Sequence, residues 1–575
     1  MVRNRLGISL RGLFDSGYGL RDRLIPRWLF LRALALLYFS AFFSLLFQIR
    51  GLIGPEGILP AREYLAAVSD ALGAKRYWFA PSLYWISSSN AALMTITWIG
   101  LIAAILALVN LWPRFTFLVC FVCFLSFVGA SGVFSSYQSD GMLLATGFLA
   151  LFFAPSGFWP GWGAVTPSPR ASLWLLQWVW FRIYFESGLV KLLSGDPEWR
   201  HLTAMDQYYQ NGPLPTWIGW YVQHWPHGFQ VFTAGATLLL ELGLVCMLFL
   251  PRRVRVVCFF IVTPWEIGVI LTANYAFLNY LVLALGILLL DDKFLRPLVP
   301  ARLRPPELAS TPMLPAEEPP LSILAPGNLN HPPDPDAADP ALESRETTAS
   351  SRPAPDLRQH ASSARRLRPA LHLSFVALTA VFLTWVAYNT TAELITLIAQ
   401  HTVLPMQPVA ALDPFRIANQ YGLFAVMTRG RYEIEFQGSN DGQHWTAYPF
   451  QYKPQALDQP PGIYAPYQPR FDWNLCFASL GDWRQNQIVV LTEERLLEND
   501  PEVLALFAGN PFAHAPPRYV RAVLWQYWFT TLAEKRLTGN WWRRAYLGLY
   551  APELTPGPDG RFAAVEMPGD LPPHD

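Results

Sequence analysis

The chain has 575 residues, of which 52% are hydrophobic and only 15% are charged, and its mean hydropathy is +0.22. A soluble globular protein typically carries about 25% charged residues, so this composition excludes a wholly soluble chain and favours one that lies largely in a lipid bilayer. The net charge of +1 gives no basis for a nucleic-acid partner.

Nine apolar stretches are candidates for membrane spans, each of which needs about 20 mostly apolar residues. The first stretch follows a basic segment and has no small-residue cleavage site after it, so it is interpreted as a signal anchor. Eight spans form a predicted helical bundle over residues 28–290, and a ninth covers 371–388. The eight lie near 28–47, 91–111, 114–134, 142–158, 173–193, 228–250, 254–272 and 274–290.

The distribution of Lys and Arg predicts the orientation of this multi-pass protein. The basic tail, residues 1–27, is predicted to be cytoplasmic, and the Arg252–Arg255 cluster falls on the same side when the spans are counted. Residues 291–370 are rich in Pro, Ala, Ser and Asp and are predicted to be a disordered cytoplasmic linker. The ninth span then carries the chain to the other side, which is the ER lumen in a eukaryote and the periplasm, across the inner membrane, in a bacterium.

Residues 410–555 differ from the apolar bundle and predict a small β-rich exterior domain with short helices. The residues at 431–437 alternate with period two, and an Asp-Gly turn follows at 441–442. The predicted elements are strands at 431–437, 445–452 and 519–529 and helices at 471–480 and 502–508. The predicted fold class is therefore a polytopic α-helical membrane bundle of eight or nine spans followed by this domain.

Five ionisable side chains are predicted to lie at membrane depth, where a charge is costly and is normally paired. Arg182 and Glu186 are four residues apart, so they share a helix face and are able to pair. A structural ion pair within the bundle is the alternative to a functional site for these two residues. Lys191 lies at the end of its span, where it can also reach the headgroup region. The five intramembrane candidates are Arg182, Glu186, Lys191, Glu241 and Glu266.

Polar and aromatic residues follow several spans on the predicted exterior side, and they suggest a vestibule that binds a peptide, a lipid or no ligand at all. Lone loop histidines are usually solvated, so no metal site is predicted. The sequence contains no recognisable catalytic motif, and the Cys120-x-x-Cys123 pair lies inside a span, where packing is the favoured interpretation. The vestibule candidates are Asp140, Trp199, His201, Asp206 and Asn274.

Several strings in this chain resemble the lipase maturation factor family. In the bundle they are GLIGPEGILP at 51–60, QSDGMLLATGF at 138–148, FRIYFESGLVK at 181–191, WRHLTAMD at 199–206 and NYAFLNY at 274–280. In the exterior domain they are FRIANQYGLF at 415–424, NPF at 510–512, PPRYVR at 516–521 and NWWRR at 540–544.

The resemblance implies an ER membrane protein in animals that helps secreted lipases to fold and assemble, acting as a chaperone-like factor and not as an enzyme. The exterior domain is the part of the family associated with contact to the lipase client, and no cofactor is implied. Exposed aromatic side chains give a large contact area. The predicted client contacts are Trp445, Tyr467, Trp473, Trp525 and Trp541.

The bundle also resembles, more distantly, the membrane region of vitamin K-dependent carboxylase. That resemblance implies an alternative function, a membrane-embedded enzyme with Lys191 as base. A buried Lys is able to act in this way. The exterior domain matches the maturation factors and not the carboxylase.

Overall fold

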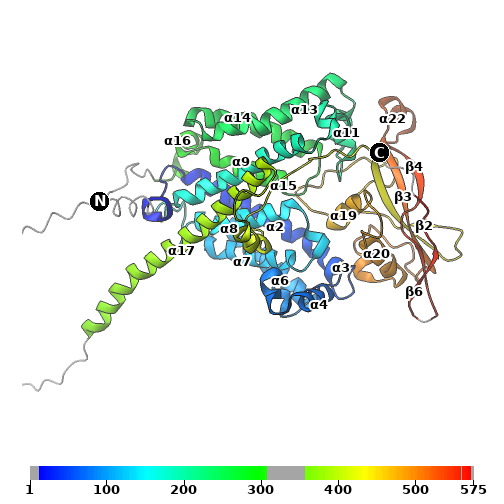
Figure 1. Ribbon diagram of the computed structural model, residues 1–575, viewed down its shortest axis with the longest axis horizontal. Coiled ribbons are helices and arrows are strands. Elements are labelled where there is room, and N and C mark those ends of the chain that lie inside the picture. The colour runs from blue at the N-terminus through cyan, green and yellow to red at the C-terminus, as the bar shows by residue number, and fades with distance from the viewer. Residues whose placement is uncertain (1–11, 307–356, 559, 571–575) are drawn as a thin grey trace, which may run out of the picture.

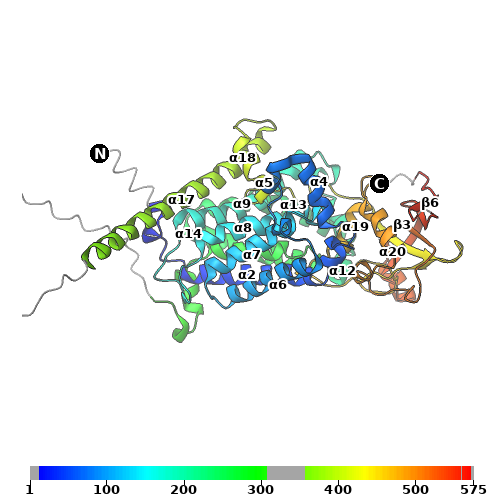
Figure 2. The same ribbon diagram turned by 90° about the horizontal axis from the view of Figure 1, so that it is seen from below.

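The computed structural model describes residues 12–306, 357–558 and 560–570. A helical bundle forms the larger part, and the C-terminal β-sheet domain sits against one end of it, so that the molecule is elongated (Figures 1 and 2). The end of the bundle that contacts this domain is called the domain end below.

All nine predicted spans are helical, and five helices are long and apolar enough to cross a membrane in the described part of the chain. The five are α2 (Leu24–Leu46), α6 (Asn90–Leu108), α13 (His227–Leu242) with η5 (Leu244–Phe249), α14 (Arg252–Thr272) and residues Leu373–Ala399 of α17 (Leu357–Ala399). Shorter apolar helices are α7 (Pro113–Val128), α8 (Gln138–Phe153) and α15 (Leu278–Gly286) with η6 (Ile287–Leu289). The chain is thus a multi-pass membrane protein, but the structure does not establish the predicted count of eight or nine spans.

Helix α9 (Arg170–Leu193) lies inside the bundle and packs against α8, α13, α15 and α17. Three charged side chains of this helix, Arg182, Glu186 and Lys191, are buried. Short helices cover the domain end. They are α3 (Ile49–Ile53), α4 (Ala61–Leu72), α10 (Pro197–Arg200), α11 (Ala204–Asn211), α12 (Trp217–Gln223) and α18 (Gln407–Leu412).

The last residues of the predicted basic tail, 1–27, are part of the bundle: Arg23 comes directly before α2, and Arg27 lies within that helix. The guanidinium of Arg23 donates to the carbonyl of Leu290, and Nε of Arg27 donates to the carbonyl of Phe153 at 2.7 Å. Both side chains are buried, so they satisfy carbonyls at the end of the bundle remote from the C-terminal domain. Residues 1–11 of the predicted tail lie outside the described residues.

The predicted linker ends earlier than the sequence suggested. Helix α17 begins at Leu357 and runs without interruption into the last apolar helix, so residues 357–370 are helical. The residues before Leu373 are too polar for the bilayer, but a helix that starts in the apolar stretch can continue into them because its backbone hydrogen bonds are internal. Residues 307–356 of the predicted linker lie outside the described residues.

The C-terminal domain contains one antiparallel six-stranded sheet in the order β2-β1-β3-β5-β6, with β4 also paired to β3. Strand β1 pairs with β3 along its whole length, with Ile434 opposite Leu524, and β4 lies beside the second half of β3. The strands are β1 (Arg431–Ser439), β2 (Thr446–Ala447), β3 (Tyr519–Phe529), β4 (Trp542–Leu549), β5 (Glu553–Pro556) and β6 (Phe562–Glu566).

Helices α19 (Arg470–Ala478) and α20 (Ile488–Leu497) cover one face of the sheet and lie between it and the bundle (Figure 1). The apolar residues of β1 point to this face because strand side chains alternate, and Phe436 stacks on Phe471 of α19. The sheet also extends to Glu566, beyond the predicted domain end at 555. The other helices of this domain are α21 (Pro501–Leu504) and α22 (Leu532–Thr538).

Candidate functional site

Residues 416–428, between α18 and β1, cross the domain end of the bundle and are called the crossing segment here. Their backbone is held by side chains from several helices. The guanidinium of Arg182 donates to the carbonyl of Asn419 at 2.8 Å, and the amide of Tyr421 donates to the carboxylate of Glu186 at 2.7 Å. The buried charges of α9 therefore bind the segment that joins the membrane helices to the sheet.

Arg182 and Glu186 also form a buried ion pair, with 2.6 Å between Nε and Oε1. A second carboxylate, Glu393 of α17, lies 3.0 Å from the same guanidinium. Arg182 and Glu186 are fully buried. Taking charges out of water is costly, so an arginine at this depth needs such partners. This arrangement ties α9, α17 and the crossing segment together at one point.

Lys191 makes a second connection to the crossing segment. Its ammonium lies 2.8 Å from the carboxylate of Glu241 on α13, and it donates to the carbonyls of Leu423 at 3.0 Å and Ser187 at 3.3 Å. It also lies 5.2 Å from the centre of the Trp199 ring. These acceptors occupy the N–H groups of the ammonium, so this geometry gives no support to the alternative in which Lys191 is a catalytic base.

Two further residues near the start of α10 hold the second half of the crossing segment. The indole of Trp199 donates to the carbonyl of Phe424 at 2.9 Å, and the carboxylate of Asp196 accepts from the amide of Met427 at 2.8 Å. Trp199 is buried, so it does not line an open vestibule as predicted. It fixes the path of the backbone instead.

Two of the other predicted vestibule residues are also buried, and each of them holds the C-terminal domain. Asp140, in the first turn of α8, forms a two-pronged ion pair with Arg470 of α19, at 2.7 and 2.8 Å. Asn274 accepts hydrogen bonds from the amides of Tyr464 and Ala465, at 2.8 and 3.0 Å. The prediction of an open vestibule is thus wrong for these two positions, because their side chains bind the C-terminal domain at a buried interface.

The remaining two vestibule candidates lie at the surface. His201 is exposed, and Asp206 pairs with the exposed ring of His227 at 3.0 Å. No group of three or more metal-ligating side chains occurs within the described residues. These two positions form no enclosed site.

A cavity of about 550 Å³ opens beside the crossing segment, between the bundle and the C-terminal domain, and is called the junction cavity here. Residues 422–428 form one wall and α19 forms another. Three apolar side chains on the cavity are strongly exposed, namely Val426 at 65%, Phe477 at 48% and Leu480 at 45%. The cavity therefore combines a polar backbone wall with apolar side chains that solvent reaches.

The thiol of Cys476 also lines the junction cavity, and it donates to the carbonyl of Pro213 at 3.4 Å. Burial raises the pKa of this thiol to about 11. A thiol is a nucleophile only as its thiolate. The cavity consequently offers no activated cysteine.

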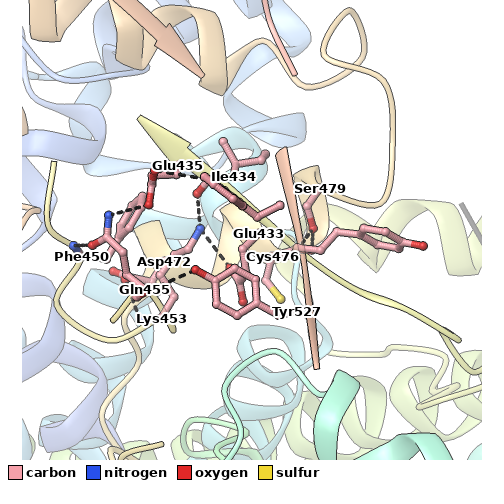
Figure 3. Close-up of polar contacts among 12 residues, drawn as sticks. Glu433, Ile434, Glu435, Phe450, Lys453, Gln455, Asp472, Cys476, Ser479 and Tyr527 are labelled. Atoms are coloured by element: carbon pink, nitrogen blue, oxygen red, sulfur yellow. Dashed lines mark hydrogen bonds and ion pairs between the residues drawn. The ribbon is translucent and has the colours of Figure 1, made fainter. Parts of the chain in front are cut away.

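Behind the cavity, the sheet contains a buried polar cluster that the sequence did not suggest (Figure 3). The ammonium of Lys453 donates to the carbonyl of Ile434 and lies 3.0 Å from the carboxylate of Glu433. Asp472 of α19 accepts from the amide of Lys453 at 3.1 Å, and burial raises the pKa of this carboxyl to about 6. The cluster links β1, α19 and the loop after β2, so it stabilises the wall that carries the junction cavity.

The predicted client-contact aromatics lie in different environments. Trp473 is buried and touches Tyr137 and Tyr275, so it fills space between the domain and the bundle instead of offering free contact area. Tyr467 lies beside Phe43 of α2, and Trp541 packs on Trp220 of α12. These three residues belong to the junction between the two parts.

The other two predicted aromatics are partly exposed on the sheet, each beneath an arginine. The guanidinium of Arg521 lies 3.9 Å from the ring centre of Trp445, and that of Arg544 lies 4.0 Å from Trp525. The ring of Trp525 points away from the face covered by α19 and α20, since Trp525 stands opposite Glu433 in the ladder. The faces of both tryptophan rings are consequently occupied by cations from the same chain.

Two sequence regions match the domains of one family. The lipase maturation factor transmembrane domain matches residues 25–297, and the lipase maturation factor C-terminal domain matches residues 417–552. Lipase maturation factor 2 of Homo sapiens is 31% identical over 93% of this chain and 83% of its own length. The chain belongs to the lipase maturation factor family. The resemblance predicted from the sequence strings is thereby confirmed.

Other members show the same extent of similarity. Lipase maturation factor 2 of Gallus gallus is 32% identical over 95% of this chain and 84% of its own length. Lipase maturation factor 1 of Bos taurus is 29% identical over 92% and 89%. No solved structure matches this lipase maturation factor family member. The two matched domains correspond to the bundle and to the C-terminal domain with most of the crossing segment.

Proposed function

We propose that this protein assists the maturation of an exported lipase by holding an incompletely folded chain at the junction cavity. The relatives are named lipase maturation factors, which supports the class of client. The observation that carries the proposal is the exposure of Val426, Phe477 and Leu480 around one cavity. Contiguous exposed apolar groups on a folded protein mark interaction sites.

The crossing segment complements these side chains. The backbone amides of Ala425 and Val426 donate to no other residue in the described part of the chain. An unfolded client segment exposes both apolar side chains and unpaired carbonyl groups. The wall of the cavity therefore has partners for both, and a client that later buries its apolar surface by assembly loses this contact.

In this proposal the C-terminal domain faces the ER lumen or, in a bacterium, the periplasm. The arginines at the other end of the bundle, such as Arg252 and Arg253 at the start of α14, support the cytoplasmic assignment of that end. An exported client passes the side on which the junction cavity opens. The protein acts by binding and carries out no chemical step.

Trp445 and Trp525 remain candidates for a second client contact. Each ring has one face covered by an arginine, and aromatic residues dominate binding energy at many interfaces. Trp473, Tyr467 and Trp541 are assigned instead to holding the domain on the bundle. The junction cavity is the favoured client contact because no arginine lies over its exposed apolar side chains in the described part of the chain.

The test is site-specific photo-crosslinking in membranes of cells that express a secreted lipase of the same organism. A photoreactive residue is placed at Phe477, at Trp525 or at Leu537, an 86% exposed leucine on α22 that serves as the control. Crosslinks to the newly made lipase from Phe477, and none from Leu537, support the proposal. Equal crosslinking at all three positions, or crosslinking at Trp525 alone, rejects the junction cavity as the contact.

A functional comparison accompanies the crosslinking. Phe477→Glu is expected to reduce the yield of active secreted lipase about tenfold, since one buried apolar contact is worth about 1.5–3 kcal/mol. Leu537→Glu places the same charge on a more exposed apolar position of the same domain and is expected to leave the yield unchanged. If neither variant reduces the yield of active lipase, the proposal is contradicted.

A further inference from the structure

A second cavity, of about 290 Å³, lies inside the bundle where α13 and α14 separate. Helix α13 packs on α9 and α11, whereas α14 packs on α15 and α12. The space between them is lined mainly by apolar side chains, among them Phe229, Trp265 and Val282. It is a different cavity from the junction cavity, but the two adjoin and share lining residues, namely Tyr208, Leu278, Leu423 and Phe424.

This inner cavity opens toward the surface of the bundle at α14. Gly268 lies at its edge, and a side-chain carbon added there would meet no atom within 4 Å. The neighbouring Ile267 and Leu271 are exposed apolar residues on one of the helices that is long enough to span the membrane. In a membrane such a surface faces acyl chains, so the opening leads into the bilayer.

Two polar groups on the cavity wall lack a full set of partners. Asn279 of α15 is 6% exposed, and its side-chain amide makes no hydrogen bond to any residue in the described ranges. Glu266 of α14 accepts a hydrogen bond from the hydroxyl of Tyr184 at 2.6 Å through Oε2, while Oε1 accepts none. Buried polar groups are normally satisfied. A ligand that both donates and accepts a hydrogen bond would complete this site.

The charged residues around the cavity indicate whether the head group of such a ligand is charged. Lys191 and Glu241 line the cavity, but they neutralise each other across 2.8 Å. No unpaired cation is left on the lining to attract a phosphate or a carboxylate. A hydroxyl group matches what remains, because it donates to Oε1 of Glu266 and accepts from the amide of Asn279, whereas an ammonium has no lone pair with which to accept.

We propose that the inner cavity binds one acyl chain of a bilayer lipid whose uncharged head group carries hydroxyls, as in a monoacylglycerol. The apolar lining takes the chain, and Glu266 and Asn279 take the head group. The volume suits a single chain and not a two-chain lipid. The head-group residues Glu266 and Asn279 line this cavity and not the junction cavity, so the lipid site can be tested separately from the client contact.

The test uses the full-length protein in phosphatidylcholine nanodiscs and a monoacylglycerol with a photoreactive group in its chain. Peptides labelled by the probe are identified by mass spectrometry, with and without excess unlabelled monoacylglycerol. Labelling of α13 and α14 that the excess suppresses is expected. Labelling that is spread over lipid-facing helices such as α6, and that excess lipid does not suppress, overturns the proposal.

Three variants make the result specific. Asn279→Leu removes the amide at similar size and is expected to weaken competed labelling about fivefold, the effect of one lost hydrogen bond. Gly268→Leu narrows the opening, and we expect it to weaken the labelling by at least the same factor. Gly228→Leu is the matched control, because Gly228 lies on α13 in open space and does not line the cavity. Unchanged labelling in both of the first two variants rejects the site.

A pair of probes tests the head group. A fatty acid and an alkyl amine with the same photoreactive chain are compared with the monoacylglycerol in the same nanodiscs. We expect both charged probes to label α13 and α14 less than the monoacylglycerol probe does, counting only the labelling that excess unlabelled monoacylglycerol suppresses. Equal labelling by either one, with the same sensitivity to Asn279→Leu, overturns the assignment of an uncharged hydroxyl head group.

Discussion

Arg470 of the C-terminal domain and Asp140 of the bundle form a fully buried ion pair in which both nitrogens of the guanidinium fork bind both carboxylate oxygens, at 2.7 and 2.8 Å. Arg470 also donates to the carbonyl of Phe134 at 2.7 Å and lies over the ring of Phe127. The contact joins α8 to α19 across 330 residues of sequence. The domain is thereby fixed on the bundle by one specific geometry.

Removing one partner of this pair should release the C-terminal domain. Arg470→Ala leaves the Asp140 carboxylate buried without a partner, and we expect a loss of about 3–5 kcal/mol in the free energy of unfolding of the junction. Thermal unfolding and limited proteolysis in nanodiscs measure the effect. Arg484→Ala is the control, because its pair with Asp482 is exposed and such pairs contribute at most about 1 kcal/mol. Similar losses in the two variants would contradict this interpretation.

The crossing segment should respond differently to the loss of each group around Arg182. Arg182→Gln leaves the carboxylates of Glu186 and Glu393 close together without their shared cation. Glu393→Gln keeps the pair between Arg182 and Glu186. We therefore expect faster hydrogen exchange of the Tyr421 amide in the first variant than in the second, because that amide is bound by Glu186. Equal exchange rates would show that the cation is not what orders the segment.

The stability of the C-terminal domain should depend on pH through Asp472. Burial raises the pKa of this carboxyl from its ordinary value of 3.8 to about 6. Between pH 4 and pH 6 the unfolded chain has lost this proton while the folded domain still holds it. The contribution of Asp472 to stability is consequently largest below pH 4 and falls as the pH rises to about 6.

Asp472→Asn removes this titration and leaves an oxygen that accepts from the amides of Tyr452 and Lys453. The free energy of unfolding of the variant relative to the natural chain should rise by up to about 3 kcal/mol from pH 4 to pH 7. Denaturant unfolding of the full chain at several pH values measures the difference. A constant difference over this range would mean that the carboxyl is not perturbed in the folded domain.

The sequence predicted the elements of this protein better than the contacts between them. Apolar length located the long helices of the bundle, and the alternation at 431–437 located β1, because each signal is local. Strands β5 and β6 carry no such pattern, since most residues of β6 are exposed on both sides. The start of α17 was missed because its first residues are polar and show no apolar pattern. They are helical because they continue the helix of the adjoining span.

The site was predictable only in part, for the same reason. The spacing of four between Arg182 and Glu186 indicates a pair, but Glu393 lies 211 residues away and nothing in the sequence marks it as a third member. Asp140 and Asn274 stand out in the sequence as polar residues beside spans, but the sequence predicted a vestibule there and not an interface. Their partners are a side chain and backbone amides of the distant domain, which only the folded arrangement brings near.

A double-mutant cycle separates the two roles considered for Lys191. Lys191→Met alone leaves the Glu241 carboxylate without its partner and is expected to destabilise the bundle by about 3–5 kcal/mol, with a matching loss of lipase maturation. Lys191→Met combined with Glu241→Leu replaces the pair by apolar side chains of similar size, which for buried pairs is often neutral. The double variant should recover most of the stability and of the secreted lipase activity. A catalytic lysine would not permit this recovery, because no second substitution restores a missing base.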